Sequence, residues 1–188
     1  KGPLELVRSR GSDLPVVVCE REIEGEMFED YAIITVGDLQ PLERFRRDPK
    51  GYFAECVEAY RRIAQKIQVD TPDPYLNKAV EAMCIAMDGC WCPPSFFHGA
   101  TTWTMHYLGW RGWYGAEALG WHERVKQAIK VHLNDQLTDE LDRGGIPHLL
   151  GARSVGYNMD EVFLDHVIYH YLWTGDRQLM REILPALM

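Results

Sequence analysis

Two short runs of β-branched residues stand out near the beginning of the chain. Residues 15–19 include three consecutive valines, and residues 31–36 read YAIITV. Valine, isoleucine and threonine at this density predict two strands, joined by an acidic connection that contains glycine. Because two strands alone do not make a stable sheet, we interpret residues 1–47 as the tail of a β domain.

The period of the apolar positions changes to three and four residues after Asp48. Asp48 can cap a helix, and Pro49 suits its first turn. The apolar stripe that follows consists of Phe53, Cys56, Val57, Tyr60, Ile63, Ala64 and Ile67. The spacing predicts a linker helix within residues 48–70. Asp73 and Pro74 then predict the start of a second helix, which ends at Gly89.

The rest of the chain alternates helices with long connections. Residues 90–114 form an aromatic-rich connection before a helix predicted over 115–133, and residues 134–157 form a glycine-containing connection. Further helices are predicted over 159–174 and from 177 to 184. The helix at 159–174 is apolar around nearly its whole circumference, which is typical of an inner-layer helix packed on most sides.

Composition narrows the class of protein. The chain has 188 residues, of which 46% are hydrophobic and 26% charged, the balance of a folded globular protein. Its 28 acidic and 20 basic residues give a net charge of −8, which argues against nucleic acid or an anionic membrane as the main partner. Its apolar runs are shorter than the roughly 18–20 residues that cross a bilayer. Five cysteines at irregular spacing do not suggest a disulfide framework.

Four short segments occur in an order that resembles a known superfamily. They are GWRGWYG at 109–115, GIPH at 145–148, YNMDEVF at 157–163 and LWTGD at 172–176. In this order and spacing they resemble the early hairpins of the six-hairpin glycosidases, which include glucoamylases, glycogen-debranching glucosidases and many bacterial glycan hydrolases. The resemblance implies a mainly α fold, with residues 71–188 forming the N-terminal part of an (α/α)6 toroid. The β segment at 1–47 and the linker helix at 48–70 would precede it.

The same resemblance implies the activity. A carboxylate acid/base pair would hydrolyse an oligosaccharide or polysaccharide without a cofactor, in a periplasmic or secreted bacterial protein. A toroid of six hairpins needs more helices than residues 71–188 supply, and in glucoamylase-like members the acid and base follow later helices. The chain therefore looks like a fragment that contributes half of a sugar cleft, with the rest of the parent chain as its partner.

Two carboxylates are the candidate catalytic residues. Asp160 lies in the segment that the superfamily places at the mouth of the cleft, and Asn158 beside it is a candidate sugar ligand. Asn158 and Glu161 also fit a helix-capping box, so a structural role for both stays open. Glu117 is the second candidate, because Gly112 and Trp113 stand where the debranching pattern has an aspartate.

Aromatic and basic residues supply further candidates for sugar binding. Trp103, Trp110 and Trp113 could stack on pyranose rings or pack in a core. Arg111 could bind a hydroxyl or a carboxylate through its planar fork, or join an ion pair. His148 lies in a connection, where ligand contacts are common.

Two other classes of function stay open. Cys90, Cys92, His98 and His106 suggest zinc, but Cys-x-Cys lacks the usual spacing and no second pair follows, so we expect no metal site. A metal-dependent toroid enzyme is nevertheless an alternative. The other is a non-catalytic carbohydrate-binding or scaffold module that uses the aromatic connection without chemistry.

Overall fold

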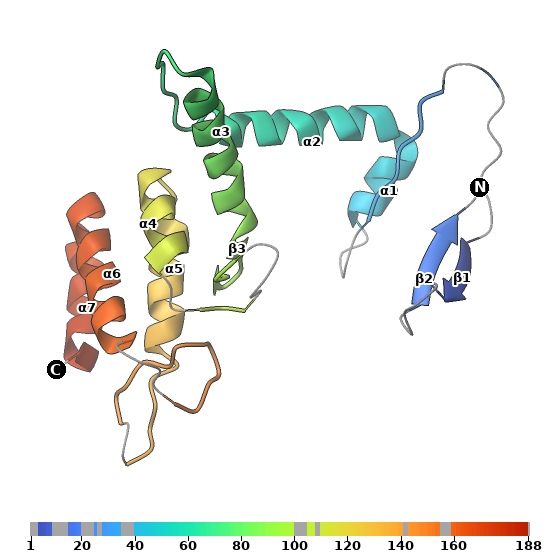
Figure 1. Cartoon of the computed structure of the whole chain (residues 1–188). Helices are drawn as coiled ribbons and strands as arrows, with labels where there is room; N and C mark the ends of the chain where they lie inside the picture. The colour runs from blue at the N-terminus through green and yellow to red at the C-terminus, as the bar shows by residue number, and fades with distance from the viewer. Residues whose placement is uncertain are drawn as a thin grey trace. The chain divides into compact units, whose positions relative to one another are not determined.

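The computed structural model describes residues 4–8, 15–19, 25, 28–34, 40–99, 105–107, 110–140, 143–154 and 159–187. The side chains of 4–8, 15–19, Trp110 and Arg111 lie outside this description. The chain divides into two compact units, Lys1–Glu55 and Cys56–Met188. Each unit is described by itself, and the described part of the chain is mainly helical (Figure 1).

The first unit contains a two-stranded antiparallel sheet. β1 (Leu4–Arg8) pairs with β2 (Pro15–Cys19), so the predicted strand at 15–19 is confirmed. The strand predicted at 31–36 is wrong over its described part, because residues 31–34 have no strand structure. Ile34 is 94% exposed there, and β-branched residues favour strands only where a pleated, half-buried surface accepts them. Residues 35 and 36 lie outside the described residues.

Two helices follow in succession. α1 (Gln40–Arg47) was not predicted, and α2 (Pro49–Ala64) confirms the helix expected after Asp48. Asp48 caps α2 as expected, since its Oδ1 accepts the backbone N–H of Gly51 at 2.9 Å. None of the α2 side chains is fully buried, so the predicted apolar stripe does not form a core here.

The second unit is a group of antiparallel helices. α3 (Pro74–Gly89) begins as predicted, because Asp73 Oδ1 accepts the N–H of Tyr75 at 2.8 Å. The remaining helices are α4 (Trp110–Ala118), α5 (His122–Leu133), α6 (Met159–Thr174) and α7 (Arg177–Leu187). α6 matches its predicted bounds, and α7 extends past its predicted end. None of the described helices is long and apolar enough to cross a membrane.

The helix predicted over 115–133 is instead two helices. A tight turn separates α4 from α5, and Gly120 at its centre has φ of +72°. This left-handed conformation strains residues other than glycine. The turn closes through the N–H of Trp121, which donates to the carbonyl of Ala116 at 2.8 Å. Apolar periodicity continues across the turn, so the sequence pattern hides the break.

The core of the second unit lies on one side of α6. Met159, Phe163 and Val167 are buried there. They pack with residues of the neighbouring helices: Trp113 and Ala116 of α4, Val125 and Ile129 of α5, and Leu179 and Ile183 of α7. The opposite side of α6 exposes Leu164, Ile168, Leu172 and Trp173. The expectation of a helix packed on most sides is therefore wrong within the described residues.

The connection after α3 contains more structure than its composition suggested. β3 (Trp91–Cys92) and β4 (Ser95–Phe96) form a short antiparallel hairpin. Isolated bridges then pair Phe97 with His106 and Tyr107 with Leu149. Residues of the two long connections thus share one small ladder. Both connections lead to the N-terminal ends of α4 and α6, which lie at the same end of the helix group (Figure 1). We call this end the loop face.

Replacing Gly120 with alanine should destabilise the second unit by about 1–2 kcal/mol, because alanine resists positive φ. Urea unfolding should show a lower midpoint with an unchanged slope. Gly120→Asn is the matched control, since asparagine tolerates the left-handed region and should lose less. Equal stability of the alanine variant and the parent would contradict the assigned turn.

Candidate functional site

A small ladder of backbone hydrogen bonds builds the loop face. The N–H of His98 donates to the carbonyl of Met105 at 3.1 Å, and that of Tyr107 donates to Phe96 at 3.3 Å. The N–H of Leu150 donates to the carbonyl of His106 at 3.2 Å. Segments from three parts of the sequence are thereby held side by side, although the sequence pattern predicted only connections.

Rings line up along this ladder. Tyr107 lies between two imidazoles, with ring centroids 5.1 Å from His98 and 6.0 Å from His148, both edge to face. Phe97 packs on His106 at 4.9 Å, and His106 Nε2 donates to the carbonyl of Cys92 at 2.7 Å. These side chains are half-buried, so each has a packed side and a side open to solvent. We call His98, Tyr107 and His148 the ring ladder.

Asp160 connects α6 to this ladder. It lies exposed in the first turn of α6, and its Oδ1 accepts the backbone N–H of Ile146 at 2.7 Å. His148 follows Ile146 by two residues, so Asp160 anchors the segment that carries one ring of the ladder. Asp160 and Glu161 also line a pocket of about 300 Å³ with Gln136 and Phe163. A carboxylate at a helix N-terminus is also favoured by the helix dipole.

Glu117 lies elsewhere in the fold and has a different environment. It is only 1% exposed, and its two oxygens accept hydrogen bonds from Nδ1 of His122 and Nδ1 of His170. His170 follows Asp160 by ten residues on α6, which is about 15 Å along the helix axis. Hydrolytic carboxyl pairs lie roughly 5–9.5 Å apart. The prediction that Glu117 and Asp160 act as a catalytic pair is therefore wrong for this geometry.

Trp113 does not serve as an exposed sugar platform. Its side chain is 1% exposed, with ring centroids 5.6 Å from His132 and 4.6 Å from His166. The neighbouring Gly112 approaches Phe96 so closely that an added Cβ would lie 2.9 Å from the Cβ of Phe96. Gly112 and Trp113 are therefore packing residues, which explains why this chain has no carboxylate at these positions.

Four other predicted site residues are only partly placed. Trp103 and Asn158 lie outside the described residues. Trp110 and Arg111 open α4 at the loop face, but their side chains are not described. Their roles in sugar binding stay predictions, whereas His148 is placed in the ring ladder.

Buried imidazoles hold the helices behind the loop face together. Ser95 of β4 is fully buried, and its Oγ lies 3.1 Å from Nε2 of His132 on α5. Burial lowers the pKa of His132 to about 3, and the nearby His106 and His166 add to the effect. Burial likewise lowers the pKa of His166 to about 4, against a smaller opposing effect of Asp165. Both rings are therefore neutral at pH 7.

The described residues contain no group of three or more histidines, cysteines or acids placed to hold a metal ion. Cys56, Cys84, Cys90 and Cys92 are free, and burial raises the pKa of the Cys90 thiol. His106, one of the zinc candidates, donates through Nε2 to a backbone carbonyl. These groups take structural roles in this part of the chain.

A comparison with known proteins found no family model, no curated protein and no solved structure that matches this chain. The function must therefore be argued from the site itself.

Sequence reasoning did not identify Tyr107 as a member of the site. The available signal was the density of aromatic and histidine residues between 96 and 107, which was considered only as a source of metal ligands. The pairing with 148–150 depends on backbone contacts between distant segments, which local periodicity does not reveal.

Replacing Ser95 with alanine should destabilise the second unit by about 1–3 kcal/mol, because Nε2 of His132 would lose its partner in a dry core. Chemical unfolding of the purified variant measures this loss. Ser154→Ala, at an exposed connection, is the control and should fall within about 0.5 kcal/mol of the parent. A Ser95 variant as stable as the parent would show that the contact contributes nothing.

Stability should fall as the pH is lowered from about 6.5 towards 4. The unfolded chain binds protons at His132 and His166 near pH 6.5, whereas the folded chain resists them down to about pH 3 and 4. Each histidine should then cost about 2–3 kcal/mol at pH 4.5 relative to pH 8. Urea midpoints across this range measure the effect, and His132→Leu should flatten the slope. Equal midpoints at pH 8 and pH 4.5 would contradict the assigned burial.

Proposed function

We propose that this chain forms part of the sugar cleft of a glycoside hydrolase, and that the loop face binds an oligosaccharide or polysaccharide. The observation that carries the proposal is the ring ladder of His98, Tyr107 and His148, held beside the N-terminus of α6 by Asp160. The ladder gathers side chains from both long connections at one end of a helix group.

The arrangement of helices supports a partial toroid. α4 and α6 both begin at the loop face and contact each other, while α3 and α5 run in the opposite direction beside them. A ring of helical hairpins has this alternation, with the N-termini of the inner helices at the cleft. The exposed apolar side of α6 is where a toroid would place further helices.

The chemistry of the loop face suits hydroxyl-rich ligands. A neutral imidazole both donates and accepts hydrogen bonds, a phenol does the same, and a carboxylate accepts from hydroxyl groups. The half-buried rings add apolar surface for the C–H faces of a pyranose. Asp160 keeps its second oxygen available on an exposed side chain, while its Oδ1 accepts from Ile146.

Within the described residues, the loop face supports binding more directly than bond cleavage. Asp160 has no second carboxyl group of the predicted pair within hydrolytic reach, because Glu117 is buried between two histidines near the other end of α6. The acid and base of the hydrolase would therefore be other residues of the protein. The same observation favours a second candidate function, a carbohydrate-binding module without chemistry of its own.

Binding of oligosaccharides to the purified chain tests the proposal. A panel of neutral and acidic oligosaccharides of four to six sugars would be titrated by calorimetry, and His148→Ala and Asp160→Asn should each weaken the best ligand about tenfold. Asparagine keeps an oxygen that can accept from Ile146, so this variant removes charge while keeping the anchor. Release of sugar from the same panel separates hydrolysis from binding alone.

Glu81→Gln, at an exposed position on α3, is the control and should leave affinity unchanged. Circular dichroism would establish that each variant keeps its helices. The proposal fails if none of the oligosaccharides binds the parent chain, or if the loop-face variants bind as tightly as the control.

A further inference from the structure

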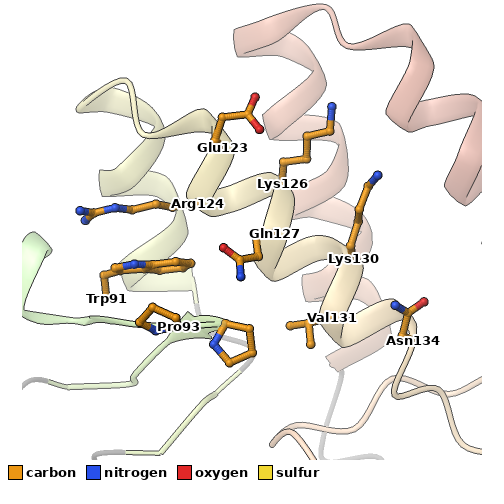
Figure 2. Close-up of a pocket in the computed structure, with 10 residues that line it drawn as sticks. Trp91, Pro93, Glu123, Arg124, Lys126, Gln127, Lys130, Val131 and Asn134 are labelled. Atoms are coloured by element: carbon orange, nitrogen blue, oxygen red, sulfur yellow. The ribbon is translucent and has the colours of Figure 1, made fainter. Parts of the chain in front are cut away.

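A second concave surface lies on the outer side of α5. It is an open groove of about 690 Å³ between the β3–β4 hairpin and α5 (Figure 2). Trp91 and Pro93 form the wall on the hairpin side, and Gln127 and Lys130 lie along the helix side. The ring ladder and the pocket beside Asp160 do not include these residues.

The hairpin wall is held in place by stacked side chains. The guanidinium of Arg124 lies 5.5 Å from the ring centroid of Trp91 and 4.3 Å from that of Trp121. Its Nη1 also donates to Asp88 on α3 at 2.8 Å. Because Arg124 is fixed from three sides, the end of the groove beside Trp91 is preformed.

The helix side of the groove is rich in donors. Lys126 donates to Asp176 and Lys130 to Glu182, each at 2.6 Å, and both acids lie outside the lining. Each ammonium has three N–H groups, so each retains donors beyond its ion pair. With Arg124, three cations line the groove against one acid, Glu123. A ligand that supplies acceptors and negative charge complements this lining.

The length of the groove indicates an extended ligand. Its helix side runs from Glu123 to Asn134, which is eleven residues or about 16 Å of helix. Exposed amides of Gln127 and Asn134 can donate and accept along this length, and Pro93 offers an apolar ring. Asn134 directly precedes the second long connection, so the groove reaches the loop face.

We propose that this groove binds an acidic oligosaccharide, a chain of sugars that carry carboxylate groups. Lys130 and Lys126 would bind the carboxylates, Gln127 and Asn134 the hydroxyls, and Pro93 an apolar sugar face. The sugar identity of the ligand rests on the proposed function, and the groove adds the charge of the substrate and a second binding surface.

The test uses the chain as described, with tetragalacturonic acid as the probe. Maltotetraose is the neutral comparison, and a tetraglutamate peptide tests whether charge alone suffices. The acid sugar should bind more tightly than either, and Lys130→Gln and Gln127→Leu should each weaken it about tenfold, with less loss of affinity on added salt for the lysine variant. Lys78→Gln is the matched control, because Lys78 forms a comparable exposed ion pair with Glu81 away from the groove.

The outcomes separate the two proposals. Acid-sugar binding that weakens only with the loop-face variants overturns the groove and supports the loop face. Weakening only with the groove variants supports the groove and argues against the loop face. Preference for maltotetraose, equal binding of the peptide, or no binding of tetragalacturonic acid to the parent chain overturns the groove proposal. Because Lys130 and Glu182 are both substantially exposed, loss of their pair should not unfold the chain.

Discussion

The packing of α6 against α4 and α5 is the contact on which the loop face depends. Met159 is buried in the first turn of α6, so the N-terminus of the helix cannot shift without opening the core. Phe163 and Val167 continue the same buried side and hold α6 beside Trp113 of α4. Because Asp160 follows Met159 directly, its direction is set by this burial. The position of the 146–148 segment then follows from its bond to Asp160.

Elements with strong local signals could be predicted from the sequence. α6 keeps its predicted bounds, and α3 begins where Asp73 caps it. The misses have physical causes. α1 is rich in charged residues and has no apolar stripe, whereas residues 31–34 have strand propensity but no partner. Gly120 breaks a continuous apolar pattern, which a turn of a few residues does not disturb.

The candidate site was less predictable because it depends on distant contacts. Asp160 was singled out from its place in a motif, and the structure gives it a bond to the segment that carries His148. Glu117 and Trp113 were equally plausible by residue type, but both are buried, and exposure cannot be read from residue type alone. Tyr107 became visible only when the backbone pairing placed it between two imidazoles.

The shared ladder of the two long connections has a consequence for the thermodynamics of association. Residues 97–98, 105–107 and 148–150 are ordered by one another through backbone bonds before any ligand arrives. Their conformational entropy is therefore lost during folding and does not have to be lost again on binding. A ligand that contacts this ladder meets a rigid surface, so its association should involve little loop rearrangement and a correspondingly small entropic penalty.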